Sequence, residues 1–208
     1  MIQKVRLAAI LVAAVLLSNC SINNSRTIYQ PDYGRNTGEI SAKNPPPSTH
    51  NNICKIYQYD RQWLTAAKAS EKKWGTPDYV LMAIVHQESK FVKHARPSYR
   101  GADSSTAYGY AQAQELTWKE YQEATNNPRA KRTSIKDSLD FIGWYNQNTN
   151  QRNKVPKTDT RNLYLAYHEG NGGFERKTYQ KKPWLLKVAK KVTQLANDYK
   201  SQAKSCRR

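Results

Sequence analysis

The segment PDYVLMAIVHQESKF (77–91) constrains the fold most, because a long apolar run ends at a carboxylate. Thr76 and Pro77 supply an N-cap and a preset first residue, which predicts that a helix begins here. On that helix Glu88 lies one turn beyond Ile84, so its side chain projects from the same apolar stripe. Since an unpaired charge on a buried face is unfavourable, the protein must either neutralise Glu88 or pair it.

Two interpretations of Glu88 are open. In the first, the loss of water and the negative end of the helix dipole both raise the pKa of Glu88, and a carboxyl that stays protonated near neutral pH can act as a general acid. In the second, Glu88 is structural, and it caps a neighbouring loop or pairs with a cation. The cations within reach along the chain are Lys90, Lys93 and Arg96.

Further segments have helical periodicity and turn signals, and strand signals are weak everywhere. These segments lie at 59–74, 134–147, 158–170 and 181–200. Gly75 ends the first, Ser134 opens the second with a capping-box-like pattern, and Gly170 is a C-cap for the third. The residues that share one stripe of the last segment are Leu185, Ala189, Val192, Ala196 and Tyr199. This stripe favours packing against the domain over contact of the Lys-rich face with an anionic membrane, so we expect a mainly α fold.

Residues 1–19 have the pattern of a secretory signal peptide. Positive charges precede the apolar run 7–17, which is shorter than the roughly 20 residues of a membrane-spanning helix. The sequence LSNC (17–20) that follows is similar to the lipobox of bacterial lipoproteins, which implies cleavage and lipidation of Cys20. Ser21 after it is compatible with sorting to the outer membrane. The alternative is ordinary cleavage that leaves Cys20 as a free thiol.

A flexible tether is expected over residues 20–53, which lack sustained periodicity and contain consecutive prolines. The folded domain then covers 54–208. With Cys20 assigned to lipid, Cys54 and Cys206 remain as an even pair in an exported, oxidising setting, which predicts a disulfide between them. Two unrelated thiols are the alternative.

The net charge of +18 implies an anionic partner, but its sign alone does not distinguish nucleic acid, lipid headgroups and cell-wall polymers. Export argues against nucleic acid, and neither a zinc-finger spacing nor an RNA-binding aromatic signature is present. The H-x-E at 86–88 lacks the P-C-x-x-C of zinc deaminases, and the H-E at 168–169 lacks the second His of a zincin. We therefore expect no metal and no cofactor.

Several motifs carry a resemblance to a known family. In order they are ESKF (88–91), then Ala95, Ser98, Gly101 and Ala102, then AYGYAQ (107–112) with Thr117, and AYHEGNG (166–172). Together they resemble the successive motifs of soluble lytic transglycosylase-like (SLT) domains. The resemblance implies a lysozyme-like α fold and cleavage of the MurNAc–GlcNAc β-1,4 linkage of peptidoglycan.

The resemblance also implies roles for single residues. Residues 109–112 match the family motif G-L-M-Q, and Tyr167 matches the Tyr of A-Y-N-A-G. We expect Ser89 and Gln112 to contact the glycan, and Tyr167 to direct its hydroxyl at the acid or the substrate. Tyr110, which replaces the usual Leu, would stack on a sugar ring. Core packing of the two Tyr residues and a capping role for Gln112 are the structural alternatives.

By the same resemblance Glu88 is the single catalytic acid. It first protonates the leaving oxygen and then, as a base, deprotonates the MurNAc C6 hydroxyl, which closes a 1,6-anhydro ring. Glu169 replaces the usual Ala, and as a second carboxylate facing Glu88 it would permit hydrolysis, as in a muramidase. Otherwise Glu169 contacts substrate or pairs with a Lys or Arg. A non-catalytic lipoprotein that binds peptidoglycan or assists assembly is a third alternative.

These inferences give an expected location and set of partners. We expect a periplasmic protein of the bacterial cell envelope, held at the outer membrane by a lipid on Cys20, with peptidoglycan strands as its substrate. Family members are sometimes built into secretion or pilus machines, which makes such machinery a candidate partner.

Overall fold

A computed structural model of the chain describes residues 45–98 and 105–206. These residues form α1 (Ile53–Tyr59), α2 (Arg61–Trp74), α3 (Asp78–Ser89), α4 (Glu115–Ala124), α5 (Ile135–Asn153), α6 (Thr160–Glu169), α7 (Asn171–Glu175) and α8 (Pro183–Ala203). Short 3-10 turns lie at Pro47–Thr49 and Thr178–Lys181. No strand occurs in the described parts of the chain, where Tyr108 and Ala113 form an isolated bridge. The mainly α fold expected from the sequence is confirmed.

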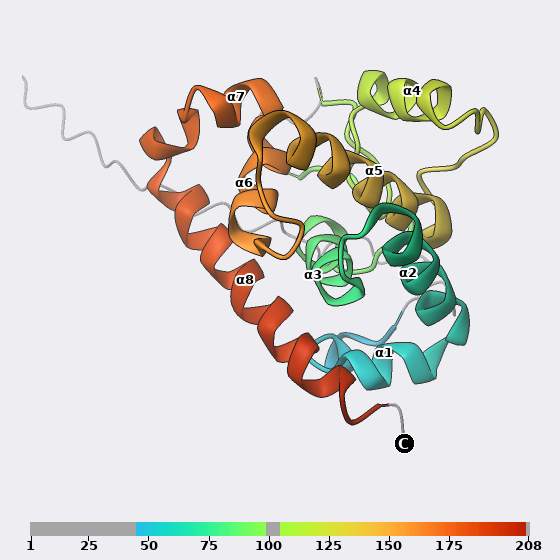
Figure 1. Ribbon diagram of the computed structural model, residues 1–208. Helices are drawn as coiled ribbons and strands as arrows, with labels where there is room; N and C mark the ends of the chain where they lie inside the picture. Colours follow the sequence, from blue (N-terminus) through green and yellow to red (C-terminus); the bar gives the residue numbers. More distant parts are fainter. Residues whose placement is uncertain (1–44, 99–104, 207–208) are drawn as a thin grey trace, which may run out of the picture.

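Helix α3 lies in the middle of the domain, and α2, α5 and α8 pack against it (Figure 1). Residues 80–85 are consecutive, apolar and completely buried, so α3 is enclosed on every side. Full burial of one Val, Leu, Ile or Met side chain contributes about 1.5–3 kcal/mol. The continuous apolar run at 80–85 thus explains why α3 is central.

The start of α3 differs from the expected one. The helix begins at Asp78, its N-cap is Pro77, and no side chain caps it. Asp78 takes over the first turn, where its carboxylate accepts a hydrogen bond from the backbone of Tyr79 (2.9 Å) and pairs with Lys68 (2.9 Å). An acidic residue there also interacts favourably with the helix dipole. The carboxylate of Asp78 in the first turn therefore takes the stabilising role that was expected of a cap by Thr76.

Helices α2 and α5 pack side by side through polar as well as apolar contacts. Ser70 donates a hydrogen bond to the carbonyl oxygen of Leu139 (2.7 Å), and the indole of Trp74 donates to Asp140 (2.8 Å). The expected ends are confirmed, because Gly75 closes α2 in a left-handed conformation and Ser134 caps α5.

Helix α8 runs along one side of the domain and packs on α3 and α6 (Figure 1). The stripe predicted from its sequence is buried along its whole length, with exposures of 0–2% at Leu185, Ala189, Val192, Ala196 and Tyr199. The Lys residues lie on the opposite, exposed face. The preference for packing against the domain is thus confirmed. No helix in the described residues is long and apolar enough to span a membrane.

The folded part extends further toward the N-terminus than the expected boundary at residue 54. The ring of His50 is buried and bonds to the carbonyl oxygen of Pro45 (2.8 Å), while its own carbonyl oxygen accepts a hydrogen bond from Tyr199 of α8. Helix α1 follows with Asn52 as N-cap. The residues from Pro45 onward therefore belong to the domain. The expected signal segment and Cys20 lie outside the described residues.

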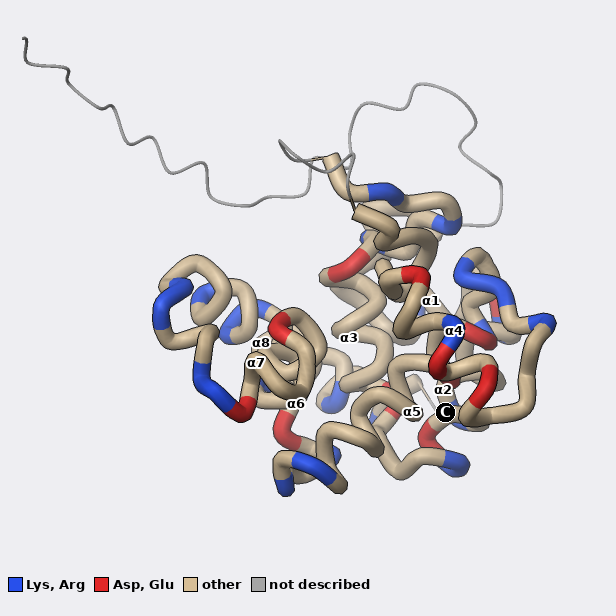
Figure 2. The backbone as a smooth tube through the Cα atoms, turned by 90° about the horizontal axis from the view of Figure 1, so that it is seen from above, with Lys and Arg blue, Asp and Glu red and all other residues tan. Residues whose placement is uncertain are grey.

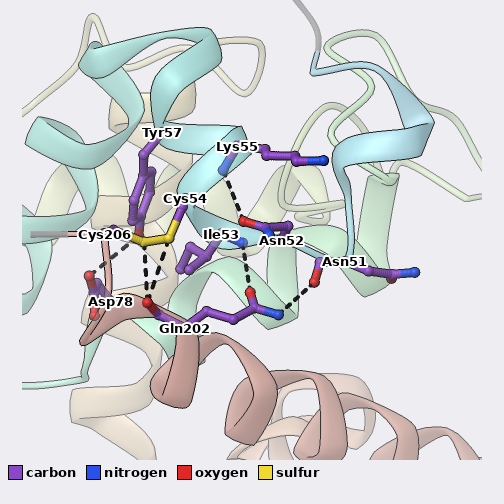
Figure 3. The surroundings of a disulfide bond; sticks show 9 residues. All are labelled: Asn51, Asn52, Ile53, Cys54, Lys55, Tyr57, Asp78, Gln202 and Cys206. Atoms are coloured by element: carbon purple, nitrogen blue, oxygen red, sulfur yellow. Dashed lines mark hydrogen bonds between the residues drawn. A yellow bond between two sulfur atoms is a disulfide. The ribbon is translucent and has the colours of Figure 1, made fainter. Parts of the chain in front are cut away.

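A disulfide joins the two ends of the domain (Figure 3). Cys54 of α1 and Cys206, just after α8, form this bond with their Cα atoms 5.2 Å apart, which is the pairing expected from the cysteine count. Gln202 reinforces the junction, because its side chain accepts a hydrogen bond from the backbone of Ile53 (3.0 Å) and donates one to Asn51 (2.9 Å). Helix α1 is thereby fixed to the end of α8.

Removal of this disulfide should destabilise the domain. We expect the double variant Cys54→Ser/Cys206→Ser to lose about 2–4 kcal/mol of unfolding free energy, because the unfolded chain gains the freedom that the cross-link removes. Urea denaturation followed by circular dichroism measures the loss. Wild-type protein in reductant is the control and should lose a similar amount, whereas an unchanged midpoint in both samples would contradict the prediction.

Candidate active site

The last turn of α3 has an unusual ending. Lys90 and Phe91 follow the helix with φ values of 49° and 62°, which residues with a Cβ rarely adopt. Tertiary packing holds this turn, because Phe91 is completely buried and its ring lies edge-on to that of Trp63 (5.4 Å between centroids). The helix ends at Ser89, so Glu88 lies in its final turn, near the negative end of the helix dipole.

The carboxyl group of Glu88 has a strongly altered proton affinity. Burial raises the pKa of Glu88 to about 7, while a hydrogen bond from Tyr164 and the charge of Lys90 act in the opposite direction. The residue lies deep among its neighbours, although part of its side chain stays accessible to solvent. Near neutral pH this group is therefore present both as an acid and as a base, as catalysis of proton transfer requires.

Tyr164 is the neighbour of Glu88 that sequence reasoning missed. It lies on α6, is 2% exposed, and donates a hydrogen bond to the carboxylate of Glu88. This bond joins α6 to the end of α3. The sequence spacing could have indicated this role, because Tyr164 precedes the motif residue Tyr167 by three positions and therefore lies on the same helix face.

Tyr167 lies close to Glu88 but directs its hydroxyl elsewhere. The hydroxyl donates a hydrogen bond to the carbonyl oxygen of Ala111 (2.5 Å). Burial and the charge of Glu88 raise the pKa of Tyr167 well above its ordinary value, so the hydroxyl stays protonated and remains a donor. Tyr167 thus fastens the 105–113 loop to α6 beside the acid.

Gln112 fastens the same loop from the other side. Its backbone is left-handed (φ 46°), and its side-chain amide donates to the carbonyl oxygens of Ala95 (2.9 Å) and Gly109 (2.8 Å). Both amide hydrogens are therefore used within the protein. The side-chain carbonyl oxygen is the atom of Gln112 through which a sugar hydroxyl could be bound.

Two of the expected substrate-binding residues lie in the core. Ser89 is completely buried and donates a hydrogen bond to the carbonyl oxygen of Val85 (3.1 Å). Tyr110 is 4% exposed, and its ring lies edge-on to Trp63 at 5.5 Å. Neither side chain presents a surface to a sugar, so the geometry supports the structural alternative for Tyr110.

Glu169 has charged and polar partners of its own. Its side chain is 3% exposed and pairs with Lys182 at 2.7 Å. Burial alone would raise the pKa of Glu169, but hydrogen bonds from Lys182, Thr178 and His168 lower it below its ordinary value. Glu169 is therefore an ionised partner in a salt bridge, and Glu88 is not among the groups that it contacts.

Two open cavities lie among the described residues near these elements, and neither of them includes Glu88 in its lining. One of about 400 Å³ lies between α2, α4 and α5 around Asp140. The other, of about 200 Å³, is lined by residues of α3 and α8, including Gln87 and Lys90 on either side of Glu88 in the sequence. Within 45–98 and 105–206 no group of three His, Cys, Asp or Glu side chains could hold a metal ion, so the residues offer no metal centre.

The described residues thus form a helical domain with one distinctive carboxyl group. Glu88, at the end of the central helix α3, has a raised pKa and accepts a hydrogen bond from Tyr164. The family model described as "Transglycosylase SLT domain" matches residues 8–206, so the chain belongs to this family. A search of curated proteins and a search of solved structures each gave no match. The family supports lytic transglycosylase-like activity on peptidoglycan at the level of the family, and the resemblance inferred from the motifs is confirmed.

Substitution of Gly109 should disturb the loop beside Glu88. Gly109 has a φ of 75°, and a Cβ there would lie 2.1 Å from the carbonyl oxygen of Arg132. We expect Gly109→Ala to lower the free energy of unfolding by about 2–4 kcal/mol, because backbone strain adds to a clash with main chain. Chemical denaturation measures the loss.

Gly170 provides the matched control. Its φ is also 75°, but no atom lies within 4 Å of the position that a Cβ would take. Gly170→Ala should therefore cost only the conformational strain at φ 75° and ψ 154°, on the order of 1–3 kcal/mol. Equal losses in the two variants would show that the contact with Arg132 has no effect.

The raised pKa of Glu88 predicts a pH-dependent stability. Because the folded-state pKa of about 7 exceeds the ordinary 4.5, stability falls as pH rises between these values and the loss is complete above pH 7. Glu88→Gln cannot titrate, so it should stabilise the protein at alkaline pH by up to about 3 kcal/mol, at roughly 1.4 kcal/mol per pKa unit. At acidic pH the two proteins should be equally stable. Urea titrations at both pH values test this, and a difference that is independent of pH would contradict it.

Proposed function

We propose that the protein is a peptidoglycan lytic transglycosylase that cleaves the MurNAc–GlcNAc β-1,4 linkage with Glu88 as its single acid and base. The observation that carries this proposal is the carboxyl at the end of α3, whose pKa burial raises to about 7. A group with this pKa can hold a proton before the reaction and accept one afterwards at neutral pH. Family membership supports the substrate class.

The proton moves in two steps. Glu88 first donates its proton to the glycosidic oxygen, so that the bond to the leaving GlcNAc breaks and Glu88 becomes a carboxylate. The carboxylate then removes the proton of the MurNAc C6 hydroxyl, whose oxygen attacks C1 and closes the 1,6-anhydro ring. The attacking hydroxyl belongs to the same sugar, so its effective concentration is high and no activated water is needed.

The surroundings of Glu169 support a mechanism with one carboxylate. A hydrolase of the usual kind needs a second carboxylate as nucleophile or base. Glu169, the candidate for that role, is committed to Lys182, Thr178 and His168. Closure of the anhydro ring is therefore favoured over hydrolysis.

Tyr164, Tyr167 and Gln112 are proposed to position the acid and the glycan. The hydrogen bond from Tyr164 stabilises the carboxylate that Glu88 becomes after the first proton transfer. Tyr167 and Gln112 hold the 105–113 loop beside Glu88. Gln112 then offers its carbonyl oxygen to a sugar hydroxyl.

We also propose that the protein works from the outer membrane of the cell envelope, through a lipid on Cys20. The support is the signal and lipobox pattern of the sequence. Lys and Arg residues gather where α7 leads into α8 (Figure 2), and these suit a substrate whose peptide stems carry carboxylates.

Mass spectrometry of digested peptidoglycan tests the proposed reaction. We expect the wild-type protein to release fragments with 1,6-anhydroMurNAc ends, at a rate that falls above pH 7 as Glu88 loses its proton. Glu88→Gln should reduce the rate by about 10²–10⁴-fold, because general acid–base catalysis is lost. Glu169→Gln, the control at the other carboxylate, should still give anhydro ends.

Other outcomes would replace the proposal. Reducing ends in place of anhydro ends would make the protein a muramidase. If the wild type and Glu88→Gln both bind peptidoglycan and degrade it equally little, the protein is a non-catalytic binding lipoprotein.

A further inference from the structure

The smaller cavity has features that the proposed reaction does not use. Its volume is about 200 Å³, and it lies between α3 and α8. Two lysines line it, Lys90 from the left-handed turn after α3 and Lys191 from α8, together with His86 and the amide-bearing residues Asn51 and Gln87. Among the described residues that line it, none is Asp or Glu.

The two lysines repel each other across this cavity. Burial lowers the pKa of Lys90 to about 8, the charge of Lys191 contributes in the same direction, and the charge of Glu88 opposes both. Two like charges that share a cavity raise the free energy of the folded protein, and an anion bound between them would remove that cost.

His86 adds a neutral wall to the cavity. Burial lowers the pKa of His86 to about 3, with further contributions from the charges of Lys90 and His50, so the ring is uncharged at neutral pH. Its Nδ1 lies 3.5 Å from Nζ of Lys90. An ammonium group has only donors, so Nδ1 accepts and the ring proton is on Nε2. The ring therefore orients Lys90 and adds no charge.

We propose that the cavity between α3 and α8 binds a small oxyanion, a carboxylate or a phosphate, between Lys90 and Lys191. Two ammonium groups with side-chain amides nearby suit an oxyanion, because each can donate a charge-assisted hydrogen bond. A volume of about 200 Å³ is below the roughly 300–1,000 Å³ of sites for drug-sized ligands, so it accommodates one such group and not a disaccharide. The oxyanion is either a stem-peptide carboxylate of the substrate, which rests on the proposed function, or a free anion.

Occupation of this cavity is coupled to Glu88. The groups that act on Glu88 are Tyr164 and Tyr167 from α6 and Lys90 from the adjoining turn. The charge of Lys90 lowers the pKa of Glu88. An anion paired with Lys90 weakens that effect, so binding raises the pKa of Glu88 and extends the active, protonated form to higher pH.

Direct binding to the full chain tests the site without any turnover. Inorganic phosphate and acetate are titrated while the backbone amide signals of Ala83 and Gln87 are followed by NMR. We expect saturable shifts in the wild type and a dissociation constant raised by about tenfold or more in Lys191→Met, because a charged hydrogen bond is lost. Lys90→Met should behave alike.

Lys190→Met is the matched control, because Lys190 is exposed on the same helix, as Lys191 is, but does not line the cavity. It should change the dissociation constant by less than about twofold, since its ammonium group lies outside the cavity and donates no hydrogen bond to the anion. Equal weakening by Lys190→Met, or no saturable shift with either anion, would overturn the proposal. Phosphate binding by a protein that cleaves no glycan would refute the proposed function and leave this site intact.

The source of the anion follows from kinetics with peptidoglycan fragments. If a stem carboxylate occupies the site, phosphate competes with substrate, and amidation of the stems raises KM for the wild type but not for Lys191→Met. If a free anion occupies it, phosphate moves the alkaline limb of activity to higher pH and leaves KM unchanged. Either result supports the site. If neither phosphate nor amidation changes KM or the pH dependence of activity, the cavity has no influence on the reaction.

Discussion

The enclosure of α3 is the constraint on which the rest of the structure depends. A helix that is apolar at every position from 80 to 85 must be covered on all sides, and α2, α5 and α8 supply that cover. Polar groups are then confined to the two ends of the helix, with Asp78 in the first turn and Glu88 in the last. Glu88 lies in that turn, and the surroundings that exclude water from α3 also raise the pKa of Glu88. The packing of α3 and the raised pKa of Glu88 thus have the same cause, which is the burial of this helix.

Much of the helical framework could be predicted from periodicity and turn residues. Helices α2, α3, α5, α6 and α8 are long enough for a buried stripe to be visible in the sequence. Helix α4 was not predicted because it buries only Trp118 and Tyr121, so no extended apolar stripe is visible. Helix α1 was not predicted because its seven residues span only two turns. The folding of the segment after Pro45 depends on contacts with α8, which no local pattern encodes.

The candidate site was predictable in position but not in the direction of its side chains. The stripe through Ile84 located Glu88, whereas its hydrogen bond from Tyr164 is a tertiary contact between helices. Motif resemblance selected Gln112 and Tyr110, but the left-handed backbone of Gln112 and the contact of Tyr110 with Trp63 decide where they point. These features arise from the folding of distant segments against one another.

The junction of Cys54 and Cys206 makes the domain a covalently closed circle. A protease that cuts one peptide bond anywhere between these residues would leave a single molecule, heavier by one water, whose pieces stay together until the bond is reduced. Tension on the N-terminal segment would likewise pass through the sulfur atoms into α8, so that α1 could not be peeled from the domain by itself. With the proposed lipid on Cys20 as the point of attachment, the folded part would bear such a load as one body.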